Sequence, residues 1–140
     1  MTDPVTASVR IAAPPDVVFP YFTDPALAVK WIADAAYLDA RPGGTFSLDV
    51  RGNPARGEYV EVDPPHRVVF TWGIEGRGDF PPGSSTVEVV LRADGADSDE
   101  TVVTLTHRDL PTEDYRRSHQ EGWGEFLGIL AGVAGSTLPD

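Results

Sequence analysis

The sequence contains no cysteine, and this absence excludes disulfide bridges, thiolate metal sites and a cysteine nucleophile. Basic residues are also scarce: 11 lysines and arginines stand against 22 aspartates and glutamates, so the formal net charge is −11. Because such a surface repels a phosphate backbone, we expect no nucleic-acid partner. The charge itself we interpret as a source of solubility.

Long hydrophobic stretches are missing as well. The longest mostly apolar run, residues 126–135, is about half of the roughly 20 residues that a membrane-spanning helix needs, so we expect no membrane insertion. The first twenty residues contain Asp3, Arg10, Asp16 and several prolines, which is unlike a signal peptide. These features predict a cytoplasmic protein.

What the sequence does contain fits one domain. Its 140 residues, of which 41% are hydrophobic, are enough to bury roughly two thirds of the surface that the unfolded chain exposes. No repeat, low-complexity tract or long linker divides the chain, so we expect residues 1–140 to form a single domain.

The N-terminal part predicts one strand followed by two short helices. Residues 5–11 are typical of a strand, and residues 14–16 (Pro-Pro-Asp) favour the start of a helix. Pro20 lies inside that helix and predicts that it is short or kinked. Residues 24 and 25 (Asp-Pro) are typical of an N-cap and first helical position, and the second helix is expected to run to about Trp31 or Ile32.

From Tyr37 onward the apolar period changes to two, which is typical of half-buried strands. The clearest strands are expected at residues 45–50, 56–62, 67–72, 86–92 and 101–108, separated by turns rich in Gly, Pro and Asp. An acidic turn is expected over residues 94–99. The longest irregular stretch is a Gly- and Pro-rich loop over residues 73–84, which is either a functional loop or a mobile connection.

The C-terminal part predicts one amphipathic helix over residues 113–131, about 28 Å long at ~1.5 Å per residue, with Thr112 as its cap. Its apolar face carries Tyr115, His119, Gly122, Trp123, Phe126, Leu127 and Leu130. Gly122 on this face either allows close approach to a sheet or leaves room beside Trp123. A run of strands followed by one helix indicates an α+β fold with an antiparallel sheet.

Four motifs resemble a known family. They are Thr23-Asp24-Pro25 with Trp31, then Arg41-Pro42-Gly43-Gly44-Thr45-Phe46, then residues 57–65 (GEYVEVDPP) continuing to Phe70-Thr71-Trp72, and finally His119-Gln120-Glu121-Gly122-Trp123 with Leu127 and Leu130. In this order, over residues 5–130, they resemble the bacterial branch of the activator of heat-shock-protein-90 ATPase homologue family, within the START-like or SRPBCC superfamily. The resemblance implies a helix-grip fold: a curved antiparallel sheet of about six to seven strands wraps around a long C-terminal helix, with two short helices after the first strand.

The resemblance also implies a cavity between the sheet and the long helix, but it does not imply one activity. The chaperone activators of the family carry this domain behind a separate N-terminal domain, for which we expect no room in these 140 residues. A chaperone partner is therefore an alternative that the resemblance does not transfer.

A small-molecule site in such a cavity draws on inward-facing side chains. The residues expected to line it are Trp31, Phe46, Leu48, Glu58, Phe70, Trp72, Leu105, His107, His119, Trp123 and Leu127. The apolar ones can equally be ordinary core. His107 and His119 are expected to point inward, and Glu58, by alternation with Val60 and Val62, is expected to face the same interior. An inward histidine with a carboxylate can act in acid–base chemistry or orient a polar ligand atom, and the alternative is a buried histidine whose hydrogen bonds are satisfied.

No metal-ligand spacing, nucleophile elbow or phosphate-binding loop is present, so we expect no metal, no cofactor and no catalytic residue. Three functions remain open. The first, which we favour, is a binding module for a small apolar or aromatic molecule. The second is a protein-interaction domain, either chaperone-linked or a homodimer, and the third is an enzyme of the cyclase or hydratase kind.

Overall fold

The computed structural model describes residues 3–94 and 99–135, which form a seven-stranded antiparallel sheet with a long C-terminal helix. The strands are β1 (Val5–Ile11), β2 (Ala35–Leu38), β3 (Thr45–Val50), β4 (Asn53–Asp63), β5 (Arg67–Ile74), β6 (Ser85–Asp94) and β7 (Glu100–Arg108), in the sheet order β1-β7-β6-β5-β4-β3-β2. Each strand expected from alternation is confirmed, and the segment around Tyr37 forms the edge strand β2. The expected acidic turn falls mainly on residues 95–98, which lie outside the described residues.

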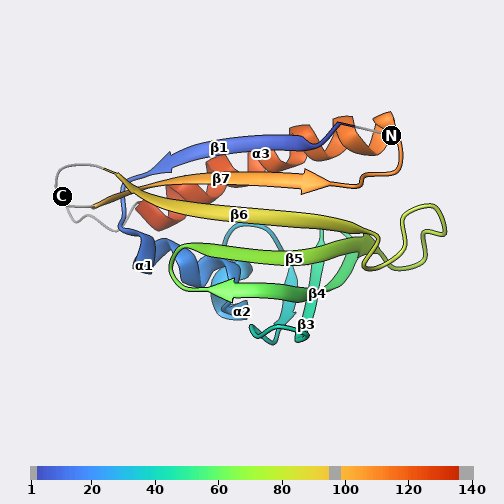
Figure 1. The fold of residues 1–140 in the computed structure, drawn as a ribbon, viewed down its shortest axis with the longest axis horizontal. Helices are drawn as coiled ribbons and strands as arrows, with labels where there is room; N and C mark the ends of the chain where they lie inside the picture. Colours follow the sequence, from blue (N-terminus) through green and yellow to red (C-terminus); the bar gives the residue numbers. More distant parts are fainter. Residues whose placement is uncertain (1–2, 95–98, 136–140) are drawn as a thin grey trace.

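The helix α3 (Glu113–Gly135) lies along β1 and β7 on one face of the sheet (Figure 1). Its buried side chains are Trp123, Leu127, Leu130 and Ala134. The hydroxyl of Thr112 accepts a hydrogen bond from the backbone N–H of Tyr115 at 3.2 Å, which confirms the expected cap. The sheet curves around this helix, so the helix-grip fold is confirmed, although α3 ends at Gly135 rather than at residue 131.

Pro20 divides the segment between β1 and β2. The three short helices there are α1 (Pro15–Val18), the 3-10 helix η1 (Phe19–Phe22) and α2 (Pro25–Ala28). Because Pro20 has no N–H, it cannot continue the hydrogen-bond pattern of α1, and the chain tightens into η1 instead. The helix α2 ends at Ala28, short of the expected Trp31 or Ile32. Trp31 follows in a turn, where its buried indole donates to the carbonyl of Tyr21 at 3.0 Å.

A bulge in β4 reverses the side-chain alternation expected there. The pairing register with β5 shifts between Tyr59 and Glu61, which inserts Val60 as an extra residue. Tyr59 is buried, whereas Val60 is 52% exposed. The alternation with Val60 and Val62 predicted that Glu58 faces the interior. That prediction is wrong. Glu58 is exposed, because residues before the bulge have the opposite phase from those after it.

The hairpin between β3 and β4 turns through two residues, Arg51 and Gly52. Val50 pairs with Asn53, and the two turn residues have φ values of 50° and 84°. Two positive φ values are typical of the tight turns that match strand twist, and glycine suits the second position because it has no side-chain penalty there. The turn holds Arg51 beside α3, where its guanidinium contacts Glu125.

The loop over residues 75–84 is fixed to the end of β5 by Phe80, which is fully buried. The backbone N–H of Ile74 donates to the carbonyl of Phe80 at 2.7 Å, and the N–H of Phe80 donates to the carbonyl of Arg77 at 3.1 Å. Gly73 is required here, because a side chain at this position would collide with the carbonyl of Pro81. The loop is thus folded back over the sheet end, and Asp79 connects it to α3 by accepting a hydrogen bond from the hydroxyl of Tyr115.

Candidate ligand-binding pocket

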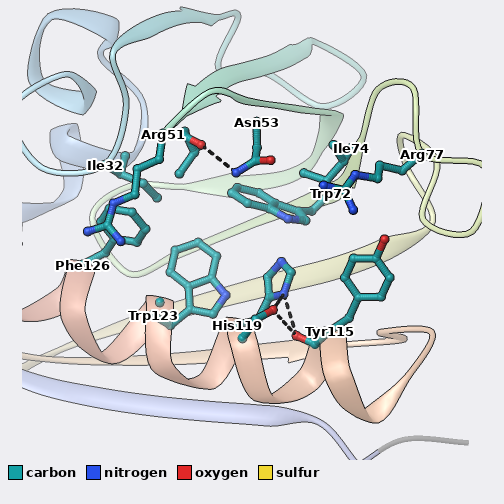
Figure 2. A pocket seen from close by; sticks show the side chains of 13 residues that line it. Ile32, Arg51, Asn53, Trp72, Ile74, Arg77, Tyr115, His119, Trp123 and Phe126 are labelled. Carbon is teal, nitrogen blue, oxygen red and sulfur yellow. Dashed lines mark hydrogen bonds between the residues drawn. The ribbon is translucent and has the colours of Figure 1, made fainter.

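A pocket of about 310 Å³ lies between α3 and the end of β5, partly open to solvent (Figure 2). Its lining residues are Ile32, Val50, Arg51, Asn53, Trp72, Ile74, Arg77, Tyr115, Ser118, His119, Gly122, Trp123 and Phe126. The residues from α3 recur every three or four positions, so they share one face of the helix. The opposite wall comes from β5, the β3–β4 hairpin and the 75–84 loop.

Two tryptophans form the apolar centre of the pocket. Trp72 on β5 and Trp123 on α3 are both almost completely buried, and their ring centroids lie 5.3 Å apart at an interplanar angle of 54°. Gly122 precedes Trp123 in the helix, and a Cβ atom at Gly122 would meet no other atom within 4 Å. Of the two expectations for Gly122, the structure supports the second: it leaves room beside Trp123.

His107 on β7 lies behind this centre and is fully buried. The indole N–H of Trp123 donates to His107 Nδ1 at 3.0 Å. His107 Nε2 lies 2.8 Å from the hydroxyl of Ser85, whose own proton is donated to the carbonyl of Trp72 at 2.6 Å. The imidazole must therefore donate from Nε2 and accept at Nδ1, so the ring is neutral. Burial, reinforced by the neighbouring His119, lowers the pKa of His107 well below its usual value.

His119 on α3 lies between this network and the pocket. Its Nδ1 is 2.7 Å from the backbone carbonyl of Tyr115, to which it donates. In the neutral ring Nε2 is then an acceptor, and Figure 2 shows this nitrogen on the side facing Trp72. Burial lowers the pKa of His119, and the carbonyl of Tyr115 opposes that shift. The rings of His107 and His119 are 5.1 Å apart, so two neutral imidazoles lie side by side.

The indole N–H of Trp72 has no hydrogen-bond partner among the described residues, although the atom is buried. The other two indoles are satisfied: Trp31 donates to a backbone carbonyl and Trp123 to a histidine ring. Leaving a buried N–H unpaired costs about 1–3 kcal/mol. Trp72 is only 4% exposed and lines the pocket. Trp72 therefore lines the pocket with its apolar ring, while its unpaired N–H is out of reach of solvent. The polar atom that the pocket offers here is Nε2 of His119.

Arginines stand at opposite ends of the pocket (Figure 2). The guanidinium of Arg51 lies 4.6 Å from the ring centroid of Phe126 and makes two contacts, of 3.3 and 2.6 Å, with the carboxylate of Glu125. This pairing lowers the pKa of Glu125. Arg77 reaches the other end from the 75–84 loop. None of the described residues that line the pocket is an aspartate or glutamate.

The residues expected to bind a ligand fall into separate places. Trp72, His119 and Trp123 line the pocket. With Trp123, the residues Trp31, Phe46, Leu48 and Phe70 surround a separate void of only about 10 Å³. A void of that size holds no more than about one water molecule, so this second group is packed core. Leu105, His107 and Leu127 are buried and border neither space, while Glu58 is on the exposed face.

The two histidines are brought together as expected, but the carboxylate is not. Because Glu58 lies outside and no acidic residue lines the described pocket, the expected histidine–carboxylate pair does not form. His107 has both ring nitrogens engaged within the protein, as in the satisfied buried histidine that was the alternative. The arrangement can hold and orient a ligand through aromatic surface, one acceptor on His119 and two cations.

Sequence reasoning missed the polar residues of the pocket mouth, chiefly Arg51, Asn53 and Arg77. These residues lie in or next to turns, where no hydrophobic period predicts the direction of a side chain. The one signal available was the length of the 73–84 loop, since long loops are often functional.

No group of three or more His, Asp or Glu side chains is arranged to hold a metal ion in the part of the chain described. Of the helices in residues 3–94 and 99–135, none is both long and apolar enough to cross a membrane.

Comparison with known proteins gives a match to the family model "Activator of Hsp90 ATPase homolog 1-like protein" over residues 12–135. A protein of Schizosaccharomyces pombe, described as uncharacterized, is 30% identical over 101 residues, which is 72% of this chain. The chain spans only 28% of the length of that relative.

Solved structures similar to this chain cover nearly all of it. The AHSA1-like protein of Rhizobium etli is 38% identical with a TM-score of 0.75, over 95% of this chain and 82% of that one. CalU16 from Micromonospora echinospora is 31% identical with a TM-score of 0.75, over 97% of this chain and 77% of that one. An HSP90 activator from Plasmodium falciparum is 26% identical with a TM-score of 0.75, over 96% of this chain and 97% of that one.

Proposed function

We propose that this chain, which belongs to the family of Activator of Hsp90 ATPase homolog 1-like proteins, binds a small hydrophobic or aromatic molecule in the pocket between β5 and α3. The observation that carries the proposal is the pocket itself, whose wall brings the indoles of Trp72 and Trp123 together with the free Nε2 of His119. A planar molecule with a hydrogen-bond donor would gain apolar contact from the indoles and a partner in His119.

The size and surface of the pocket support a ligand of this class. Its volume of about 310 Å³ lies at the lower end of the range of roughly 300–1,000 Å³ typical of small-molecule sites. The indoles of Trp72 and Trp123 and the ring of Phe126 offer flat apolar surface, which suits stacking with a planar molecule. The open space next to Gly122 allows such a molecule to lie along α3.

The polar atoms of the pocket define how the ligand would be oriented. We assign the binding contacts to Trp72, His119 and Trp123. Nε2 of His119 accepts from the ligand, so a hydroxyl or N–H group of the ligand is held there, while the indoles of Trp72 and Trp123 contact its apolar body. His107 acts indirectly, because its hydrogen bond from Trp123 fixes the angle of that indole. The packed core around Phe46 and Phe70 supports the pocket from beneath.

The proposal is tested with N-phenyl-1-naphthylamine, a neutral aromatic probe whose fluorescence rises in apolar surroundings. We expect saturable binding to the wild-type protein. Gly122→Leu places a side chain in the open space of the pocket and should weaken binding by about ten-fold or more, which corresponds to roughly 1.4 kcal/mol of lost contact.

Gly124→Leu is the matched control. Gly124 is exposed on the same helix, and a Cβ there also meets no atom within 4 Å, but it does not line the pocket. Gly124→Leu should bind the probe like the wild type. If the wild-type protein fails to bind, or if both leucine variants bind equally well, the pocket is not the binding site.

A second candidate function is interaction with a chaperone, favoured by the family match and by the likeness to the HSP90 activator from Plasmodium falciparum. It predicts that the purified protein raises the ATPase rate of a heat-shock protein 90 in a coupled assay. It also predicts that Gly122→Leu leaves this stimulation intact, since the pocket is not needed for it. An unchanged ATPase rate at saturating protein would remove this candidate.

A further inference from the structure

The geometry points to an acidic ligand: the molecule bound in the pocket carries an anionic group that pairs with Arg77, while its apolar body lies toward Trp123 and Phe126. This inference rests on the proposed function and adds the charge of the ligand and its direction in the pocket. It depends on the fact that Arg77 forms no ion pair among the described residues, whereas most other cations of the chain do.

Arg77 is a cation without an ion pair in a chain rich in acids. Among the described residues, eight of the 11 basic side chains form salt bridges, and only Lys30, Arg77 and Arg92 do not. Acidic residues outnumber basic ones by 22 to 11, so partners for a surface arginine are plentiful. Of the three unpaired cations, Arg77 alone lines the pocket in the described structure.

The carboxylates nearest to Arg77 in the chain are held by other groups. Glu75 lies 3.5 Å from the guanidinium of Arg56. Asp79 accepts a hydrogen bond from the hydroxyl of Tyr115 at 3.1 Å, which ties the loop to α3. Neither carboxylate forms an ion pair with Arg77 in the described structure, and its guanidinium therefore remains available to a ligand at the pocket mouth.

At the opposite end of the pocket, by contrast, the arginine is ion-paired. Arg51 is paired with Glu125 and stacks on Phe126, so its charge is compensated. No aspartate or glutamate lies among the described lining residues. The pocket thus has an apolar, neutralised end at Phe126 and an uncompensated positive end at Arg77. An amphipathic acid fits this polarity in one direction only.

The net charge of −11 makes this local cation necessary. The protein's overall field repels anions, so a negatively charged ligand gains no help from long-range attraction. Recognition of an anion must come from short-range contact with Arg77, whose planar guanidinium can bind a carboxylate or sulfonate through two hydrogen bonds.

The test uses two probes with the same aromatic body. 1-Anilinonaphthalene-8-sulfonate carries a sulfonate, and N-phenyl-1-naphthylamine is the same ring system without it. The readout is the ratio of their affinities, measured by fluorescence titration for the wild type, for Arg77→Met and for Arg92→Met. Arg92 is the matched control, since it is an exposed arginine without a salt bridge among the described residues and lies on β6 away from the pocket.

We expect Arg77→Met to lower the affinity ratio of sulfonate to neutral probe by about five-fold, the scale of one ion pair at a partly exposed site. Arg92→Met makes the same change in net charge and should leave the ratio as in the wild type. If the neutral probe binds and Arg77→Met does not alter the ratio, the acidic-ligand inference is wrong while the binding function stands. An equal fall for Arg92→Met would show a general charge effect and overturn the inference as well. If neither probe binds the wild type, the proposed function itself fails.

Discussion

Acidification should destabilise this protein through His107, in a pH range above that in which carboxylates titrate. The pKa of His107 is lowered well below its usual value of 6.5, because the ring is buried and because His119 lies beside it. Its Nδ1 accepts a hydrogen bond from Trp123. A proton on Nδ1 would face the indole N–H and break that hydrogen bond. The folded protein therefore keeps the ring neutral, while the unfolded chain protonates it at the usual pKa.

The sign follows from proton binding in the two states. Between the lowered folded pKa and 6.5, the unfolded state binds the proton and the folded state does not, so the free energy of unfolding falls as the pH falls. Above about pH 7 both states are neutral at this site, and the full stability is present. At pH 5.5 the loss from His107 is on the order of 1 kcal/mol, relative to pH 7.5. His119, whose pKa is also lowered by burial, adds a loss of the same sign.

The measurement is the free energy of unfolding from urea titrations at pH 7.5 and 5.5, with thermal melts alongside. The loss from His107 should lower the Tm by about 5 °C for a chain of this size. His107→Gln replaces the ring with a side chain that cannot titrate but can still accept from Trp123 and donate to Ser85. This variant should be less stable at both pH values, and its loss on acidification should be smaller than that of the wild type by an amount on the order of 1 kcal/mol. A wild type equally stable at both pH values, or a variant with the same loss as the wild type, would refute the reasoning.

Three substitutions test other parts of the fold. Tyr59→Phe removes the buried hydroxyl that donates to the carbonyl of Phe22 at 2.8 Å, and should lower the free energy of unfolding by about 1–2 kcal/mol in a urea titration. Gly128→Ala should raise it by up to about 1 kcal/mol, because Gly128 lies in an exposed helix interior with no atom in the way of a Cβ; unchanged stability would contradict this. Asp24→Ala removes the cap that accepts from the N–H of Ala26 at 2.9 Å, and should lower the free energy of unfolding by about 1 kcal/mol, seen as a lower Tm, whereas Asp24→Asn should retain most of the stability.

The strands and the long helix could be predicted because burial on one face forces a simple period. Phe46, Leu48 and Val50 alternate along β3, and Trp123, Leu127 and Leu130 recur along α3 at the spacing of one helix face. Where a proline interrupts the pattern, as at Pro20, the local break could also be predicted.

The failures occurred where one residue changes the phase or the direction of the chain. The bulge at Val60 has no strong sequence signal, and a single inserted residue moved Glu58 from the expected inner face to the outside. The end of α2 at Ala28 was missed for a related reason: Trp31 is buried at the expected helical spacing, but from a turn rather than a helix.

The candidate pocket could be predicted in its aromatic part and not in its charged part. Trp72, His119 and Trp123 lie on regular elements, so their direction followed from the periods of β5 and α3. Arg51 and Arg77 lie in turns, and their positions depend on the φ of 50° at Arg51 and on the burial of Phe80. The apolar residues that instead fill the core have the same period as those of the pocket, so only packing distinguishes the two groups.

Two features of the pocket lower the stability of the fold. The unpaired N–H of Trp72 costs about 1–3 kcal/mol, and Gly122 in the helix interior costs up to about 1 kcal/mol relative to alanine. Gly122 allows no close contact that would offset this, since nothing lies within 4 Å of its Cβ position. In the same protein, the indoles of Trp31 and Trp123 are both satisfied. Gly124, Gly128 and Gly132 carry the same cost in the same helix without lining the pocket, so the unpaired N–H of Trp72 is the departure that is specific to this part of the fold. Local departures of this kind tend to gather at functional sites, which supports the proposed binding of a molecule against the Trp72 ring.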